Sequence, residues 1–277
     1  MDNIDFKQGS CVFSALKPVF DQYSYNHCCN VYYEDDSLDI IPYSYSVMEE
    51  IVGLTLSCSN DEDTFYCVGE ALAKLHSISL SFWGPVTEKS QAASVNDYYT
   101  MYYNKVLHNL DKYDKHLYRI VTEVIENNYC PCLYAGRAPV LLHHDFHFSN
   151  IMVSTNKNIK FIDWDSARGG LEELDFVKLK YMNLLHLPLS KLQSFISGYN
   201  SHRTLELNQN YYVYELVWLA KMVIFESNNS NDNKSYYPSK QFYLEMLKKS
   251  LDRIDTYDEM LLTPNRYSIN AWLSNCI

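Results

Sequence analysis

Three polar residues, Asp145, Asn150 and Asp163, stand at the ends of short apolar segments and suit metal-dependent phosphate chemistry. Asp145 follows VLLHH, Asn150 comes five residues later, and Asp163 ends the segment IKFID. A carboxylate can accept a hydroxyl proton, while an amide oxygen and a second carboxylate are ligands that Mg²⁺ takes beside nucleotide phosphates. Asp and Asn also form turns for local reasons, so each residue alone is weak support. Together they predict phosphoryl transfer, with Asp145 catalytic and Asn150 and Asp163 binding the metal.

Two motifs carry a family resemblance: His143-His144-Asp145-Phe146-His147-Phe148-Ser149-Asn150, and then Ile162-Asp163-Trp164-Asp165. They resemble the catalytic loop and metal-binding turn of the aminoglycoside phosphotransferase and choline kinase family, which shares its core with protein kinases. The family usually has Gly where this chain has His144. The resemblance implies an α+β, protein-kinase-like two-lobe fold, with a reduced N-terminal β lobe and a large, mainly helical C-terminal lobe. It also implies ATP and Mg²⁺ as cofactors.

The same resemblance assigns supporting roles to residues outside the chemistry. His143 would brace the catalytic loop, and Asp175, in Glu-Leu-Asp-Phe, would support the loop. His76, at the end of the segment Ala-Lys-Leu-His-Ser, corresponds to a structural histidine. None of these three residues is expected to take part in the reaction itself.

The segment SVMEEIVGLTL resembles the hinge between the two lobes of this family. Met48, Glu49 and Glu50 would then line the nucleotide pocket, with the hinge backbone along the adenine edge. A simpler interpretation is an edge strand that leads into a loop. The hinge divides the chain into a reduced N-terminal lobe with the hinge, residues 1–53, and a C-terminal lobe, residues 54–277.

The N-terminal lobe departs from the family pattern. It has no GxGxxG segment, Lys7 is the sole candidate for the family's strand lysine, and Asp21 is a weak stand-in for the acidic partner of that lysine. These groups position nucleotide phosphates, on which transfer mainly depends. Three explanations follow: a divergent active enzyme, a pseudokinase that binds nucleotide or a partner, or a reading frame taken to begin too late.

Apolar spacing and turn residues predict the elements around these motifs. Strands are expected over residues 30–33 and 43–48, and a loop over 81–93. Asp61 or Asp63 would cap the second helix. The expected helices cover residues 11–23, 61–79, 96–128, 171–185, 189–199, 210–225, 238–254 and 265–273.

The short distance from Asp163 to the next helix favours a small-molecule acceptor, because no room remains for a peptide-docking activation segment. By resemblance, an aminoglycoside-like antibiotic is the first expectation, followed by choline, another amino alcohol or a sugar. Glu172 and Glu173 would form an acidic lip for an amine, or serve as first-turn helix charges. Asp165 would contact metal-bound water or a cationic substrate, or be a turn residue.

The composition of the chain limits which partners, locations and cysteine states we expect. A net charge of -11 over 277 residues argues against nucleic acid as a partner. The sequence has neither a long apolar run nor a secretory signal, so we expect no membrane span and a cytoplasmic location. The eight cysteines lack zinc-site spacing and are expected to be reduced thiols. The oligomeric state is not specified by the sequence.

Overall fold

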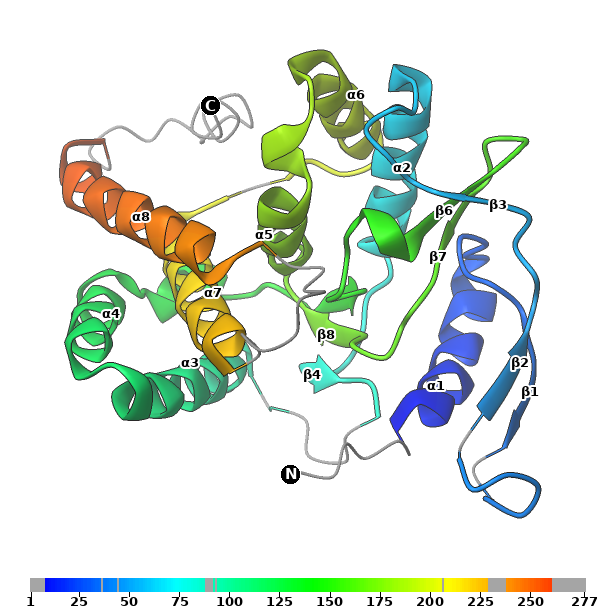
Figure 1. The fold of residues 1–277 in the computed structure, drawn as a ribbon, viewed down its shortest axis with the longest axis horizontal. Coiled ribbons are helices and arrows are strands. Elements are labelled where there is room, and N and C mark those ends of the chain that lie inside the picture. The colour runs from blue at the N-terminus through cyan, green and yellow to red at the C-terminus, as the bar shows by residue number, and fades with distance from the viewer. Residues whose placement is uncertain are drawn as a thin grey trace. The chain divides into compact units, whose positions relative to one another are not determined.

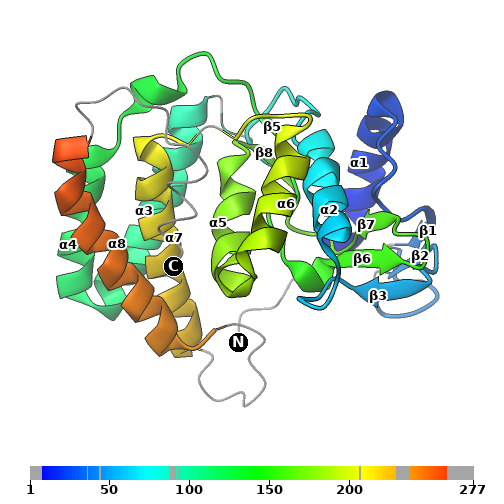
Figure 2. The ribbon, with the colours of Figure 1, turned by 90° about the horizontal axis from the view of Figure 1, so that it is seen from above.

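The computed structural model describes residues 8–35, 37–43, 45–87, 92, 94–205, 207–228 and 238–260. It divides into two compact units (Figures 1 and 2). Unit 1 comprises Met1–Ala92 with Ala138–Leu205, and unit 2 comprises Ala93–Arg137 with Glu206–Ile277. Lys7 and the helix expected over residues 265–273 lie outside the described residues. The lobe boundary at residue 53 stays a prediction.

Unit 1 begins with a helix and three small antiparallel sheets. Helix α1 covers Gln8–Tyr23, and Val12, Leu16 and Phe20 form its buried face. The first sheet pairs β1 with β2, the second has the order β3-β6-β7, and the third has the order β4-β8-β5. The strands are β1 Val31–Asp35, β2 Tyr45–Met48, β3 Gly53–Thr55, β4 Gly84–Pro85, β5 Val140–Leu142, β6 Ile151–Ser154, β7 Ile159–Phe161 and β8 Arg168–Gly170.

Helices α2, α5 and α6 complete unit 1, with bounds Glu62–Leu75, Glu173–Met182 and Leu189–Asn200. Asp61 caps α2 as predicted, because its carboxylate accepts a hydrogen bond from Thr64 N–H at 2.9 Å. Two glycines let α2 and α6 approach closely. A Cβ on Gly69 would lie 2.0 Å from Phe195 O, and one on Gly198 would lie 2.0 Å from Tyr66 O. Larger residues at these two positions would separate the helices.

Unit 2 is built from helices around a core rich in tyrosine. Its helices are α3 Val95–Tyr113, α4 Lys115–Asn128, α7 Gln209–Asn228 and α8 Lys240–Met260. The rings of Tyr99 and Tyr134 stack at 4.9 Å, and Tyr214 meets Tyr99 edge-on at 6.0 Å. The tyrosines of α3 therefore serve packing, as large apolar rings do in cores.

Two sequence predictions about elements are corrected. The helix expected over residues 96–128 is two helices, because Asp114 is extended (φ -152°) and its carboxylate caps α4 through His116 N–H and Leu117 N–H. The loop expected over 81–93 contains β4, where Gly84 pairs with Gly169. A two-residue strand carries no periodic signal, and a capping Asp within a helical pattern looks like any other polar position.

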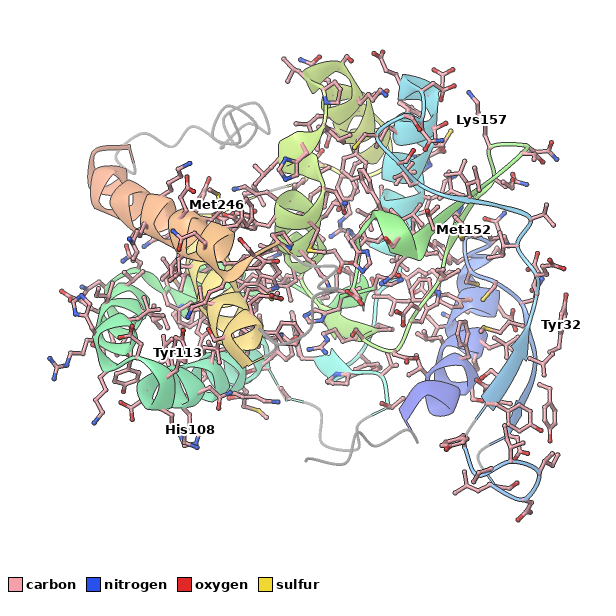
Figure 3. All side chains as sticks on the ribbon, viewed as in Figure 1. Tyr32, His108, Tyr113, Met152, Lys157 and Met246 are labelled. Atoms are coloured by element: carbon pink, nitrogen blue, oxygen red, sulfur yellow. A yellow bond between two sulfur atoms is a disulfide. The ribbon has the colours of Figure 1, made fainter. Side chains whose placement is uncertain are left out.

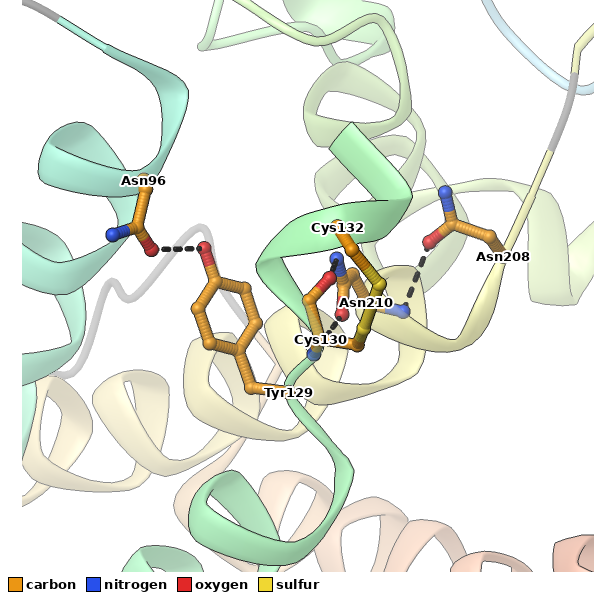
Figure 4. The surroundings of a disulfide bond; sticks show 6 residues. All are labelled: Asn96, Tyr129, Cys130, Cys132, Asn208 and Asn210. Carbon is orange, nitrogen blue, oxygen red and sulfur yellow. Dashed lines mark hydrogen bonds between the residues drawn. A yellow bond between two sulfur atoms is a disulfide. The ribbon is translucent and has the colours of Figure 1, made fainter. Parts of the chain in front are cut away.

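A disulfide joins Cys130 and Cys132, so the expectation of reduced thiols is wrong for this pair (Figure 4). Their Cα atoms are 5.4 Å apart, within the range that a disulfide spans. The Asn210 side chain bonds to Cys130 N and to Cys130 O, at 2.8 and 2.7 Å. The expectation rested on cellular compartment and zinc spacing, neither of which reports the backbone geometry of this turn.

The fold class is confirmed as α+β with a reduced N-terminal lobe: before the predicted hinge, the described residues contain α1, β1 and β2. Among the described residues, every helix is too short or too polar to cross a membrane.

Candidate active site

The catalytic segment, residues 143–150, connects two strands with buried ends. Strand β5 is buried at all three residues and pairs with β8, and Leu141 N–H also bonds to Ile78 O at 2.8 Å. The segment ends in a 3₁₀ turn, Phe148–Asn150, directly before β6. These attachments fix both ends of the segment and leave the Asp145 side chain 21% exposed.

Asp175 lies beneath this segment at the start of α5 and is fully buried. Its carboxylate accepts hydrogen bonds from His143 N–H at 3.0 Å and His144 N–H at 2.7 Å. His76 Nε2 lies 3.1 Å from the same carboxylate, and His76 Nδ1 lies 3.0 Å from Tyr199 OH. Bonds from a buried carboxylate to two successive peptide N–H groups fix the backbone there. The supporting roles of Asp175 and His76 stay predictions.

His143 links the catalytic segment to the predicted metal-binding turn. Its Nε2 lies 2.8 Å from Ile162 O, and its Nδ1 accepts a hydrogen bond from Asp145 N–H at 3.3 Å. Burial lowers the pKa of His143, although Asp175 opposes this effect. The ring is therefore neutral, with its proton on Nε2, where it meets a carbonyl oxygen. The His143 side chain therefore connects the backbone of Asp145 to the backbone of Ile162, which directly precedes Asp163.

Two of the site residues have left-handed backbones. The φ angles of His144 and Asp163 are +60° and +62°. Glycine adopts this region freely, whereas other residues adopt it at a cost, with Asn, Asp and His the most tolerant. The position of His144, where the family usually has Gly, thus requires a positive φ. At Asp163 the same conformation turns the chain out of β7.

Asn150 and Asp163 lie at the same end of the β6–β7 hairpin. Asn150 directly precedes β6, Asp163 follows β7, and Ile162 N–H donates to Asn150 O at 3.0 Å. Asn150 Nδ2 donates to Asp145 O at 2.9 Å. This bond orients the amide so that Oδ1 points away from the Asp145 backbone. The hairpin and the amide therefore place the three predicted residues in one hydrogen-bonded frame.

These oxygens fit Mg²⁺ better than a metal that needs a full protein cage. Within the described part of the chain, no three His, Cys, Asp or Glu side chains cluster so as to hold a metal. Mg²⁺ retains waters and takes one or two protein oxygens together with substrate phosphates. The Asn150 amide oxygen and the exposed Asp163 carboxylate suit such a set. Their assignment as metal ligands stays a prediction.

Two further groups surround Asp145. The Lys178 ammonium group forms an ion pair with Asp145 Oδ1, and His147 Nε2 lies 3.6 Å from the same oxygen. Burial, with a smaller contribution from His143, lowers the pKa of His147 to about 4. His147 is therefore neutral at pH 7, and Lys178 carries the positive charge at Asp145.

Lys178 was not predicted from the sequence. It stands three residues after Asp175, on the same face of α5. Most residues of α5 are buried, and the Lys178 side chain is 14% exposed. A lysine within such a helix was the available signal, since a buried lysine needs a partner.

In the predicted hinge, Glu49 is held by hydrogen bonds, whereas Met48 and Glu50 are exposed. Asn30 N–H and Nδ2 donate to Glu49 Oε2 at 3.0 and 2.9 Å, and Glu49 N–H donates to Asn30 O at 2.8 Å. Lys160 Nζ lies 3.9 Å from the same carboxylate. Met48 and Glu50 are exposed. Glu49 thus ties the hinge to residue 30, and Met48 and Glu50 remain the accessible members of the predicted nucleotide edge.

The acidic lip expected from Glu172 and Glu173 is not formed. Both residues are buried, and Glu172 Oε1 accepts a hydrogen bond from Arg203 at 3.1 Å. They begin α5, where carboxylates favour the positive end of a helix. Asp165, by contrast, is exposed, and loss of solvent around its carboxyl, together with the nearby Asp163, raises its pKa.

A separate hollow of about 880 Å³ lies between α1 and residues 25–34, with Lys160 in its wall. Its lining, among the residues described, includes Asp21 but none of Met48, Glu49, Glu50, Asp145, Asn150 and Asp163. On α1, Lys17 pairs with Asp21 at 3.5 Å at the surface. The role of Asp21 as the family's acidic partner stays a prediction, because Lys7 lies outside the described residues.

Comparisons with known proteins agree with this geometry. The profile of the phosphotransferase enzyme family matches residues 26–190, more than half of the chain, including the predicted hinge and the whole predicted catalytic segment. No curated protein matches the chain.

Solved structures resemble the chain in fold. Choline kinase LicA from Streptococcus pneumoniae has a TM-score of 0.60 at 14% identity, over 91% of this chain and 82% of that chain. An ethanolamine kinase from Plasmodium vivax has a TM-score of 0.57 at 13% identity, over 87% and 73%. Spectinomycin phosphotransferase APH(9)-Ia, in complex with ADP and spectinomycin, has a TM-score of 0.53 at 13% identity, over 100% and 82%.

At these identities the solved structures establish the fold, and the profile establishes the family. The chain belongs to the phosphotransferase enzyme family and is a small-molecule phosphotransferase with an alcohol group as acceptor.

Proposed function

We propose that the chain transfers the terminal phosphate of ATP to a hydroxyl group of a small, amine-bearing molecule. The observation that carries this proposal is the frame that joins Asp145, Asn150 and the turn at Asp163 through His143 and the Asn150 side chain. Phosphoryl transfer depends mainly on positioning and electrostatics, and a rigid frame provides both.

Asp145 orients the acceptor hydroxyl and takes its proton as the new bond to phosphorus forms. Asp175 accepts hydrogen bonds from His143 N–H and His144 N–H, and His143 Nδ1 accepts one from Asp145 N–H. These bonds keep the carboxylate of Asp145 in place before the acceptor arrives. Neutral His147, 3.6 Å away, does not compete as an ion-pair partner at pH 7.

Asn150 and Asp163 would hold Mg²⁺ beside the nucleotide phosphates. When bound, the metal neutralises negative charge on these phosphates. The Asn150 amino group is engaged with Asp145 O, so Oδ1 is the atom that would be available to the metal. Met48 and Glu50 would form the exposed part of the adenine edge, while Glu49 accepts a hydrogen bond from the Asn30 side chain.

An amine-bearing acceptor is favoured by charge and by analogy. The net charge is -11, and exposed Asp165 stands two residues after Asp163. The solved structures of similar fold include proteins named for choline, ethanolamine and spectinomycin. An aminoglycoside-like antibiotic is our first candidate, with choline, another amino alcohol or a sugar next.

A transfer assay tests the reaction. Wild type is incubated with radiolabelled ATP, Mg²⁺ and a panel of aminoglycosides, choline, ethanolamine and sugars. With the acceptor that responds, we expect Asp145→Asn to lower kcat by about 10²–10⁴-fold, the range of a positioned acid or base. The control is Asp111→Asn, which removes an exposed carboxylate from α3. Full activity of Asp145→Asn would contradict the catalytic assignment.

A binding assay tests the nucleotide site independently of the acceptor. We expect ATP to raise the melting temperature of wild type more in the presence of Mg²⁺ than in its absence, because a ligand of the folded state stabilises it. Asp163→Asn should lose the Mg²⁺-dependent increment, and Asp111→Asn should keep it. Binding without transfer to any acceptor would instead support the pseudokinase alternative, which the unmatched strand lysine motivates.

A further inference from the structure

Lys178 is placed at the predicted reaction centre by the same helix that supports the catalytic segment. Asp175, three residues earlier on α5, bonds to the backbone of His143 and His144, and Lys178 reaches the Asp145 carboxylate. Its side chain is 14% exposed and that of Asp145 is 21% exposed. A partly desolvated ion pair of this kind is stronger than a surface pair.

The other lysines of unit 1 for which the structure gives a polar partner are engaged away from Asp145. They are Lys17 with Asp21, Lys74 with Glu70, Lys157 with Asp61, Lys160 with Cys28 O and Lys191 with Cys58 O. Among these described lysines, Lys178 is the one paired with the predicted catalytic carboxylate. The ammonium of Lys178 therefore supplies positive charge at the Asp145 carboxylate.

The distances expected between the reacting atoms show how near the transferring phosphoryl group would lie to the Lys178 ammonium group. An acceptor oxygen lies about 3 Å from the carboxylate that takes its proton. The attacked phosphorus lies about 3–3.5 Å from that acceptor oxygen before reaction. The transferring group therefore falls within about 6–7 Å of the Asp145 oxygen that Lys178 already contacts. A lysine has a flexible four-carbon stem and can cover this distance by rotating its side chain.

We propose that Lys178 is a catalytic residue: it holds Asp145 in the free protein and contacts the oxygens of the transferring phosphoryl group during reaction. The inference rests on the proposed function. The acceptor oxygen forms a bond to the terminal phosphorus, the bond from that phosphorus to the ADP oxygen breaks, and the acceptor proton moves to Asp145. Lys178 keeps its proton and balances the negative charge that spreads over the phosphoryl oxygens.

Kinetics separate this role from a structural one. With the responding acceptor, we expect Lys178→Met to lower kcat at least about 100-fold, as removal of a transition-state donor does, with KM for ATP unchanged. Lys178→Arg should recover part of the rate because it restores the charge. Lys74→Met, which removes a lysine paired with Glu70 on α2, should retain wild-type kcat. A double variant Lys178→Met/Asp145→Asn should be slower than Asp145→Asn alone, because the ammonium group acts on the phosphoryl oxygens and not only on Asp145.

A second readout needs neither the acceptor nor turnover. MgADP with aluminium fluoride presents an anionic stand-in for the transferring phosphoryl group. We expect aluminium fluoride to raise the melting temperature of MgADP-bound wild type and of Lys74→Met, but not that of Lys178→Met. Lys178→Arg should show part of the increase. If Lys178→Met fails to fold, Lys178→Gln replaces it in both assays.

The outcomes distinguish the two proposals. A wild type that neither transfers phosphate nor responds to MgADP refutes the proposed function, and the role of Lys178 with it. An active wild type whose Lys178→Met variant keeps its kcat and its response to aluminium fluoride refutes only the role of Lys178. Equal losses in Lys178→Met and Lys178→Arg, matched by a fall in the melting temperature of both, would assign Lys178 to structure.

Discussion

At the scale of single residues, His144 shows how the catalytic segment stores strain. Its φ angle is +60°, and its N–H donates to the buried Asp175 carboxylate at 2.7 Å. A left-handed backbone costs a residue with a side chain roughly 1–2 kcal/mol. The hydrogen bond and the burial of Asp175 hold the peptide in this conformation despite the cost, as is common where structure surrounds a functional site.

Replacing His144 measures this strain. We expect His144→Gly to be more stable than His144→Ala by about 1 kcal/mol in chemical denaturation, because both lack the imidazole and differ in their tolerance of positive φ. The same pair of substitutions at exposed His108, in helix α3, should give the opposite order by about 1 kcal/mol. If Ala is as stable as Gly at position 144, the left-handed backbone is wrong.

Some residues of the candidate site can be predicted from the sequence, and others cannot. Asp145, Asn150 and Asp163 could be picked out because their types, order and spacing lie within one short stretch, and the hairpin between them is local. Lys178 could not, because its pairing with Asp145 depends on α5 passing beneath the catalytic segment through Asp175. No spacing rule connects a loop residue to a helix residue that tertiary packing brings together.

At the scale of elements, Asp61 joins the start of α2 to the turn of the β6–β7 hairpin. One carboxylate oxygen accepts bonds from Thr64 N–H at 2.9 Å and Thr64 Oγ1 at 2.6 Å. The other accepts a bond from Lys157 at 2.7 Å, and Figure 3 labels Lys157 at the tip of the hairpin. Lys157 and the Thr64 bonds together hold the pKa of Asp61 well below its usual range.

This link predicts a pH dependence with a definite sign. Because the folded pKa of Asp61 is lowered, its stabilisation is fully present above the ordinary Asp pKa and is lost as pH falls through the folded pKa. We expect wild type to melt above Asp61→Asn at pH 7, with the difference shrinking progressively below about pH 4. Asp111→Asn, which removes an exposed carboxylate from α3, is the control. A difference in melting temperature between wild type and Asp61→Asn that grows as the pH falls would contradict the ion pair of Asp61 with Lys157.

The disulfide of unit 2 gives a second prediction about an element. It closes a loop of only three residues, for which chain-entropy arguments give about 1.5 kcal/mol. We expect Cys132→Ser, or a reducing agent, to lower the free energy of unfolding by that amount. Cys58→Ser, at an exposed free cysteine, should leave it unchanged. An unchanged Cys132→Ser variant would show that both thiols are reduced in solution.

The boundaries of elements were less predictable than their existence. The periodic apolar residues of α1, α2, α6 and α7 gave those helices in the right places. The break between α3 and α4 was missed because Asp114 stands within an unbroken apolar stripe, and its capping role appears only from its hydrogen bonds. Each unit is also discontinuous along the chain, and local patterns contain no information about such pairings.

At the scale of the whole molecule, buried neutral histidines link stability to pH. Burial lowers the pKa of His27, His143 and His147, the last to about 4. Between about pH 6.5 and pH 4, the unfolded chain binds a proton at His147 that the folded protein does not. The free energy of unfolding therefore falls as pH drops through this window, and His147 alone accounts for about 3 kcal/mol at most.

Melting temperatures measured from pH 8 to pH 4 test this linkage. We expect wild type to lose stability steadily below about pH 6.5. His147→Gln should lose less over the same range, because it has no proton to take up on unfolding. His108→Gln is the matched control: Figure 3 labels this histidine on α3, it is exposed, and its variant should follow wild type. Identical slopes for wild type and His147→Gln would mean that His147 titrates normally in the folded protein. Other groups, among them His27 and His143, would then account for the acid sensitivity.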